Sequence, residues 1–392
     1  MNLPPRPPTT INSRGHPPEF EEIIQEKSHN FVGREFVFTA INNFLHRHNQ
    51  GYFTIIGAPG SGKSAILIKY VTNNPQVIYY NAELEGKNRA DEFLVNICTQ
   101  LINQYSLNYA SLPDNATEGS WFFSNLLQQI SEKLEPHQKL LIAIDGLNCI
   151  DRNSQPPATN LFYLPRYLPD GVYFLLTRRP FLREKSGLLI ETPSQSLDLA
   201  DYPEQNRRDI QAYIQSYLTP EEIPPTPIFK GGNISPLLRG DIKSWLSNHQ
   251  INEQEFCDRI TTLGENNFMY VSQIIGAIPS VSFANSENFY QEPFQYNQLP
   301  PGLEAYYQQH LHKMIPPEQG MEHSINVLNV LIQQQKAISV EAIAQIIDTD
   351  EYEVEEVLES WLEFLQQEQI DGITHYSLYH FSFRHWLSTQ QI

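Results

Sequence analysis

The sequence predicts an α/β domain with a parallel sheet and helices on both of its faces, followed by a small helical domain and a winged-helix domain. Apolar runs alternate with helical stretches from Phe31 to about Pro193, which is the pattern of βα units. The runs are continuous rather than alternating in polarity, as expected of strands that helices cover on both faces. After Leu199 the strand signals fade and helical periodicity follows.

Each element is expected where the hydrophobic period fits it. Strands of the parallel sheet are expected over 52–56, 77–80, 140–144, 172–177 and 188–191. The helical domain has helix candidates over 203–218, 235–248, 253–262 and 269–277. An irregular connection over 279–301 precedes helices over 302–314, 325–335, 340–347 and 352–367, a strand over 374–379 and a last turn through Trp386. Three helices with a β-ribbon in about 70 residues favour a winged helix.

These changes of pattern place the domain boundaries. We expect an N-terminal tail over 1–30, the α/β domain over 31–200, the helical domain over 201–300 and the winged helix over 301–392. The first segment is assigned as a tail because it is rich in Pro and polar residues and has no sustained period.

The chain is strongly acidic, with 45 Asp and Glu against 26 Lys and Arg and a formal net charge of −19. Such a chain is repelled by nucleic-acid phosphates unless it has a basic stripe, and the sequence shows none. No apolar stretch approaches the roughly 20 residues of a membrane span. The N-terminus lacks the apolar region of a secretion signal, and Cys98, Cys149 and Cys257 are too scattered for a disulfide framework. We therefore expect a cytoplasmic protein without membrane or nucleic-acid partners.

The most specific motif is GAPGSGKS, which lies between the first expected strand and a helical stretch. Glycines allow a turn in which successive backbone N–H groups face one anion, and the lysine and the last serine add a cation and a Mg²⁺ ligand. A flexible linker would not be flanked by a β-rich apolar run and a periodic helix. The sequence therefore predicts a phosphate-binding P-loop made of Gly57, Pro59, Gly60, Ser61, Gly62, Lys63 and Ser64.

Two other strand ends carry candidate site residues. Asp145 follows the buried run 140–144, where an open α/β sheet places its ligands, and is predicted to orient Mg²⁺ together with Ser64. The run 172–177 ends in Arg178 and Arg179, and arginine suits a sensor of the γ-phosphate. A surface arginine pair that balances carboxylates is the alternative. The guanine-reading signature NKxD is absent from the sequence, which favours adenine.

Taken in order, the motifs FVGRE, GAPGSGKS, LLIAIDGLN, LLTRRP, NNFMYV and LYHFSFRHWL resemble the STAND ATPases of the NACHT and apoptotic-ATPase type. The resemblance covers about 31–392. It implies a P-loop ATPase core, a helical domain and a winged helix that close over ADP and open on exchange for ATP. It further implies that Val32 and Arg34 lie against adenine and ribose, that Arg179 is the sensor, and that His380 reaches the β-phosphate of ADP.

The chain departs from the family after Asp145, where Asn148 stands in place of an acid. An amide orients water but cannot take its proton, so hydrolysis is expected to be slow or to depend on Asp151. Our first interpretation is a switch that binds ATP, ADP and Mg²⁺, signals through protein partners and self-associates in the ATP state. The alternatives are an origin-recognition-like AAA+ ATPase with a DNA-binding winged helix and a nucleotide-binding scaffold without hydrolysis.

Overall fold

The computed structural model describes residues 17–28, 31–84, 86–157, 159–181, 187–219, 241–278, 296–315, 321–334, 336–361, 364–370, 372–378 and 381–390. Its contacts divide the chain into two compact units, Met1–Asp209 and Ile210–Ile392, which we call the first and the second unit. The boundary falls inside one helix, near the predicted end of the α/β domain.

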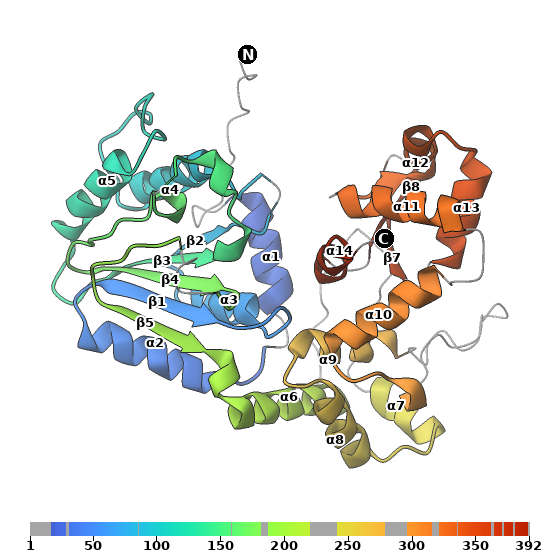
Figure 1. Ribbon diagram of the computed structural model, residues 1–392. Coiled ribbons are helices and arrows are strands. Elements are labelled where there is room, and N and C mark those ends of the chain that lie inside the picture. Colours follow the sequence, from blue (N-terminus) through green and yellow to red (C-terminus); the bar gives the residue numbers. More distant parts are fainter. Residues whose placement is uncertain are drawn as a thin grey trace. The chain divides into compact units, whose positions relative to one another are not determined.

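The first unit is built on a five-stranded parallel sheet (Figure 1). The strands lie side by side in the order β2-β3-β4-β1-β5. Their bounds are β1 Gly51–Ile56, β2 Ile78–Asn81, β3 Leu140–Asp145, β4 Val172–Arg178 and β5 Ser194–Asp198. The parallel α/β fold class predicted from the sequence is therefore confirmed, and β4 separates the strand before the P-loop from the strand that ends in Asp145.

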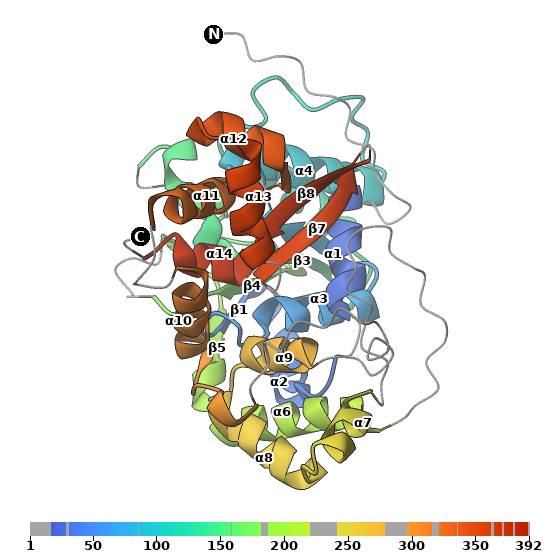
Figure 2. The same cartoon turned by 90° about the vertical axis from the view of Figure 1, so that its right-hand side faces the viewer.

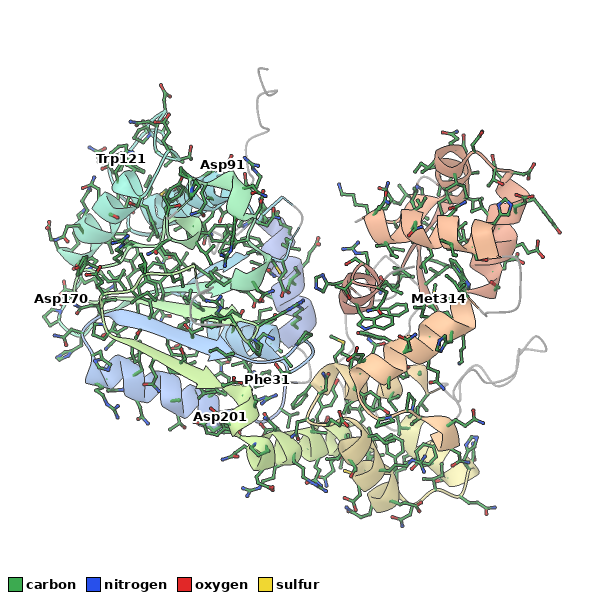
Figure 3. The ribbon with its side chains drawn as sticks, viewed as in Figure 1. Phe31, Asp91, Trp121, Asp170, Asp201 and Met314 are labelled. Atoms are coloured by element: carbon green, nitrogen blue, oxygen red, sulfur yellow. The ribbon has the colours of Figure 1, made fainter. Side chains whose placement is uncertain are left out.

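Helices cover both faces of this sheet. They are α1 Pro18–Ser28, α2 Glu35–Arg47, α3 Lys63–Asn73, α4 Ala90–Gln104 and α5 Trp121–Ser131. Phe44 of α2 packs on Phe53 at a ring distance of 5.7 Å, whereas Phe123 of α5 packs on Phe174, whose neighbour across the sheet is Tyr52. Consecutive strand residues point to opposite faces, so α2 and α5 lie on opposite sides of the sheet. Figure 3 shows the side chains that fill both layers.

The fifth strand is displaced from its predicted position. Residues 188–191 form no strand, and β5 runs over Ser194–Asp198 instead. This strand is polar because it is at the edge of the sheet, where only Leu197 is buried, so it carries no apolar run for the sequence to show.

Part of the segment expected to be a tail, residues 18–28, forms helix α1 and belongs to the core. Phe20 and Ile24 are buried, and the Phe20 ring lies 5.7 Å from that of Tyr79 and 5.5 Å from that of Tyr80. Tyr79 and Tyr80 are consecutive in β2 and point to opposite faces, so a ring that meets both lies at the open edge of the strand. Residues 1–16 and 29–30, which also belong to the predicted tail, are outside the described residues.

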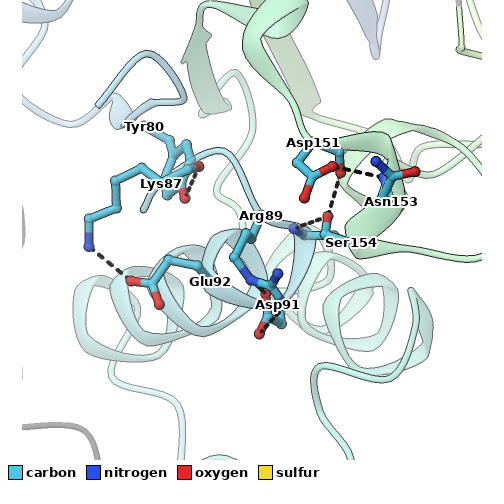
Figure 4. A network of polar contacts seen from close by, with 9 residues as sticks. Tyr80, Lys87, Arg89, Asp91, Glu92, Asp151, Asn153 and Ser154 are labelled. Carbon is cyan, nitrogen blue, oxygen red and sulfur yellow. Dashed lines mark hydrogen bonds and ion pairs between the residues drawn. The ribbon is translucent and has the colours of Figure 1, made fainter. Parts of the chain in front are cut away.

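Lys87 ties α1 to the following part of the chain. Its ammonium lies 3.2 Å from the Glu19 carboxylate of α1 and 2.9 Å from that of Glu92 in α4. Figure 4 shows Lys87 with Glu92 and the backbone carbonyl that receives the Tyr80 hydroxyl. Both ion pairs are partly exposed, so each contributes at most about 1 kcal/mol, and the buried rings provide most of the attachment.

The second unit is mainly helical and has a small antiparallel sheet of order β6-β8-β7, of which β7 and β8 are labelled in Figure 2. Its helices are α6 Pro203–Leu218, which begins in the first unit, α7 Asp241–Asn248, α8 Glu253–Leu263, α9 Phe268–Ala277, α10 Leu303–Met314, α11 Met321–Gln333, α12 Val340–Ile347, α13 Glu351–Ser360 and α14 Phe381–Leu387. Its strands are β6 Ile338–Ser339, β7 Leu365–Ile370 and β8 Ile373–Leu378. One continuous hydrophobic cluster runs from α6 to α14. No helix in the described residues is long and apolar enough to cross a membrane.

The helix predicted over 352–367 ends at Ser360, and its last part is strand β7. Trp361 follows the last helical residue, and its buried indole donates a 2.8 Å hydrogen bond to the carbonyl of Met314, which is labelled at the end of α10 in Figure 3. Residues of β7 after Leu365 are exposed, and the strand pairs with β8 along its length. Such a polar segment has no hydrophobic period that predicts a strand, and it is extended because it pairs with β8.

His310 is a titratable group inside the second core. Its ring lies 4.1 Å from that of Tyr306 and 4.8 Å from that of Phe364, and 8% of the residue is exposed. Burial, followed by the nearby charge of Lys313, lowers the pKa of His310 to about 3. The unfolded chain, with a histidine pKa near 6.5, therefore binds a proton that the folded chain rejects between about pH 3 and pH 6.5.

This pKa predicts that the second unit loses stability as the pH falls from 6.5 toward 3. We expect the free energy of unfolding to fall by about 2 kcal/mol more between pH 7 and pH 5 in the wild type than in His310→Gln. Urea unfolding at the two pH values measures the difference. His312→Gln, on an exposed position of the same helix, is the control and should behave like the wild type. An equal acid response in all three proteins contradicts the prediction.

Candidate functional site

The P-loop connects β1 to the first turn of α3. Gly60 and Gly62 have φ angles of 77° and 89°, a left-handed conformation that strongly favours glycine. A Cβ on Gly57 would lie 2.6 Å from Ser61 Oγ, whereas one on Gly62 would meet nothing closer than the Arg34 guanidinium at 3.6 Å. The loop therefore packs on itself at its start and is open at the N-terminus of α3, where backbone N–H groups attract anions.

Lys63 and Ser64 are the first two residues of α3. The Lys63 ammonium donates a 2.9 Å hydrogen bond to the carbonyl of Ala58 and so lies back over the loop. Burial lowers the pKa of Lys63 to about 8, and the carboxylates of Asp145 and Glu83 oppose this effect. The negative charges of two acids at the carboxyl edge of the sheet thus act on the ammonium.

Asp145 ends β3 and is completely buried. The Thr177 hydroxyl of the neighbouring strand β4 donates to Asp145 Oδ1 and accepts a 2.9 Å hydrogen bond from the Gly146 N–H. The Tyr79 hydroxyl interacts with the Asp145 carboxylate, but Asp145 Oδ2 has no hydrogen bond of ordinary geometry among the described residues. A buried carboxylate oxygen without a partner is costly unless a cation reaches it, so this residue fits a Mg²⁺ ligand.

The two arginines that end β4 have different surroundings. Arg178 is 5% exposed, its guanidinium lies 3.4 Å from the centroid of the Phe181 ring, and burial lowers its pKa to about 10. Arg179 is partly exposed, and its charge lowers the pKa of both Lys63 and Glu83. Arg179 is therefore the arginine near the P-loop, as its assignment as the sensor requires.

Asn148, the predicted water-orienting residue, lies in a short 3₁₀ helix over Leu147–Cys149. Its Oδ1 accepts a 3.2 Å hydrogen bond from the Arg179 N–H, and its Nδ2 donates to Cys149 Sγ at 3.2 Å. In this arrangement the Asn148 side chain holds the end of β4 beside the end of β3, and so positions Arg179.

Asp151, the other acid considered for hydrolysis, caps the 3₁₀ helix Arg152–Ser154 (Figure 4). Its Oδ1 accepts from the Asn153 N–H at 2.9 Å, and its carbonyl accepts from the Ser154 hydroxyl. The Ser154 oxygen in turn accepts from the Ala90 N–H at the start of α4. The Asp151 carboxylate is thus used to fix a loop.

Arg34, expected beside adenine and ribose, is only 2% exposed and has a left-handed φ of 69°. Its Nη2 donates to the carbonyl of Ser61 at 2.7 Å and its Nη1 donates to Asn206 Oδ1. The carboxylate of Asp209 accepts the Arg34 N–H at 3.1 Å. The guanidinium therefore joins the P-loop to the first turns of α6, and Val32 lies partly buried just before it.

Glu83 is a site residue that the sequence analysis missed. It lies beyond the end of β2, is partly buried, and has a pKa raised by burial first and by Asp145 second. The charges of Lys27, Lys63 and Arg179 oppose that shift. A signal was present, because polar residues that follow a buried strand reach the same edge of a parallel sheet as the P-loop. His380, in contrast, lies outside the described residues.

The sequence matches no protein-family model, and no curated protein matches it. Among solved structures, the chain is similar to the STAND protein with a tetratricopeptide repeat sensor PH0952 from Pyrococcus horikoshii, with 15% identity and a TM-score of 0.40 over 93% of this chain. The chain spans 44% of the length of that protein.

Two further similar structures have nearly the length of this chain. Drosophila ORC bound to DNA has 13% identity and a TM-score of 0.35 over 93% of this chain and 96% of that chain. The Thermotoga maritima RuvB Holliday junction branch migration motor has 11% identity and a TM-score of 0.30 over 94% and 99%. At these values the three likenesses assign no ligand, activity or partner to this chain.

Proposed function

We propose that this chain binds ATP and ADP with Mg²⁺ at the P-loop and acts as a nucleotide-dependent conformational and oligomerisation switch with slow ATP hydrolysis. The observation that carries the proposal is the meeting of three strand ends at one edge of the sheet. They bring Lys63, the unpartnered oxygen of Asp145 and the charge of Arg179 to the open N-terminus of α3. This combination of cations, a free buried carboxylate oxygen and helix N–H groups suits a nucleotide with its metal ion.

Each residue has a separate task in this proposal. The P-loop backbone and Lys63 would hold the phosphates, and Ser64 and Asp145 would hold Mg²⁺, which supplies positive charge to the phosphate oxygens. Arg179 would donate to the terminal phosphate, which is present in ATP and absent from ADP. Asn148 would keep Arg179 in place through the 3.2 Å bond to its backbone.

Arg34 supports the switch part of the proposal. Its guanidinium is bonded to the P-loop carbonyl of Ser61 and to Asn206 in α6, the helix whose chain continues into the second unit. A loop that moves when it takes up phosphate would therefore disturb the start of α6. A switch requires that ADP and ATP differ in their affinity for two conformations of the P-loop and the start of α6.

For the second unit we propose the helical and winged-helix parts that the resemblance implies, over 201–300 and 301–392, with His380 reaching the ADP β-phosphate. Protein partners suit this unit better than nucleic acid, because its helix α13 carries an acidic exposed surface. The exposed acids are Glu351, Glu353, Glu355, Glu356 and Glu359. They would repel a phosphate backbone.

The test is a titration of the full chain with ADP and with a non-hydrolysed ATP analogue, both with Mg²⁺, followed by mass measurement by light scattering. We expect both nucleotides to bind, a monomer with ADP and a larger assembly with the analogue. A chain that binds neither nucleotide contradicts the proposal. A salt-titrated gel shift is the parallel measurement, and nanomolar sequence-specific DNA binding would favour the origin-recognition alternative instead.

A further inference from the structure

The end of β2 is fixed against the end of β3 by backbone and side-chain contacts. Asn81 is paired with Asp145 in the sheet, and the next N–H, that of Ala82, donates a 2.9 Å hydrogen bond to the Asp145 carbonyl. The Glu83 N–H then donates to Asn81 Oδ1 at 2.8 Å, and Asn81 is itself buried. Glu83 thus leaves the strand in one defined direction, beside the acid predicted to hold Mg²⁺.

The Glu83 side chain lies over Gly146, the residue that follows Asp145. A Cβ on Gly146 would overlap Glu83 Cγ and would lie 3.3 Å from its carboxyl carbon. Gly146 also has a left-handed φ of 76°, so both the backbone angle and the space at this position suit glycine. The carboxylate is therefore held at the carboxyl edge of the sheet, where the charges of Lys63 and Arg179 act on it.

We propose that Glu83 is the general base of ATP hydrolysis in this chain, a role that rests on the nucleotide-binding function proposed above. The other residues considered for hydrolysis already have tasks of their own. Asn148 is an amide whose oxygen receives the Arg179 N–H, and Asp151 caps a 3₁₀ helix. Asp145 accepts from Thr177 with one oxygen, and its other oxygen would be the Mg²⁺ ligand in the function proposed above.

The proposed step is a simple hydrolysis. The oxygen of a water molecule attacks the γ-phosphorus, and the bond from this phosphorus to the oxygen shared with the β-phosphate breaks. The electron pair of that bond leaves with ADP, and the Glu83 carboxylate accepts the proton of the attacking water and later passes it to solvent. Lys63 and Arg179 stabilise the charge that gathers on the phosphate oxygens. General bases of this kind contribute about 10²- to 10⁴-fold to a rate.

Glu83→Gln tests the proposal, because it keeps the size and most contacts of the side chain but cannot take a proton. We expect its steady-state turnover of Mg·ATP to fall at least about a hundredfold, while the Kd values for ADP and ATP change less than about threefold. The second readout is the nucleotide that remains bound: after mixing with ATP, the variant should hold ATP where the wild type holds ADP. Glu83→Asp, which keeps a carboxylate at a shorter reach, should have intermediate turnover.

Glu92→Gln is the matched control, because it makes the same chemical change at a partly buried position outside the site, where Glu92 pairs with Lys87. It should retain wild-type turnover. Equal turnover in Glu83→Gln and the wild type would overturn the proposal. So would a variant that loses nucleotide affinity together with turnover, because Glu83 would then be a structural residue. If the wild type binds nucleotide but does not hydrolyse ATP, only the role proposed for Glu83 is contradicted. If the wild type binds no nucleotide, the proposed nucleotide-binding function is contradicted as well.

Discussion

Replacing Lys63 by alanine is expected to lower the affinity for ADP and ATP by at least about a hundredfold. The ammonium would lose charge-assisted hydrogen bonds to phosphate, each worth about 1.5 to 3 kcal/mol. Its removal would also take away one of the positive charges that offset the acids Asp145 and Glu83, which both act on Lys63, when the polyanion binds. A loss of about 2.7 kcal/mol corresponds to a factor of 100 in Kd. Isothermal titration with each nucleotide measures the loss.

Lys69→Ala is the control for this experiment, because Lys69 lies on the same helix, farther from the loop. Its affinities should match those of the wild type. The thermal unfolding midpoint of the Lys63 variant should stay near that of the wild type, since the fold holds the ammonium against a burial penalty. If both lysine variants bind nucleotide with wild-type affinity, the P-loop assignment is wrong.

The second large effect is expected at Arg34, where alanine should destabilise the first unit by about 3 to 5 kcal/mol. Removing one partner of a buried charge pair costs this much, and although Asp209 is partly exposed, the buried Arg34 guanidinium makes two further hydrogen bonds. The change would leave Asp209 without its guanidinium partner at 3.8 Å and would free the carbonyl of Ser61 and the amide of Asn206. Hydrogen exchange measured peptide by peptide separates the two units, and protection should fall in β1 and α3.

Arg47→Ala, at the exposed C-terminal end of α2, provides the comparison for this prediction. It removes the same side chain without breaking a buried contact and should leave exchange unchanged. Asp209→Asn tests the pair from the other side, and a double variant no less stable than Arg34→Ala alone would show that the two residues act together. Wild-type protection in the Arg34 variant would contradict the buried network.

The central part of the first unit could be predicted because its residues carry local signals. Strands β1 to β4 are continuous apolar runs, and their predicted bounds differ from the observed ones by at most one residue at either end. The edge strand β5 and the hairpin strand β7 carry no such runs, because one is exposed at the sheet edge and the other faces solvent. Helix α1 is short and polar on most of its surface, and its buried Phe20 packs against rings about 60 residues away.

The candidate site divides in the same way. The P-loop and Asp145 could be identified because a glycine pattern and a strand end are local features of the chain. The partners of Arg34 in α6 are 172 and 175 residues distant in sequence, and Glu83 reaches the site only because β2 pairs with β3. These residues come together only when distant segments pack and strands pair, and the sequence analysis did not derive that arrangement.

Helix α1 also bears on how this protein can be handled. An unpaired strand edge is a template for pairing with another chain, and the ring of Phe20 lies across the edge of β2. A truncated chain that begins at Phe31, where the recognisable motifs begin, would expose the Tyr79 and Tyr80 rings together with that edge. Self-association of the truncated chain through this edge would occur with or without nucleotide and could be mistaken for nucleotide-dependent oligomerisation. Measurements of assembly should therefore use a chain that keeps residues 17–28.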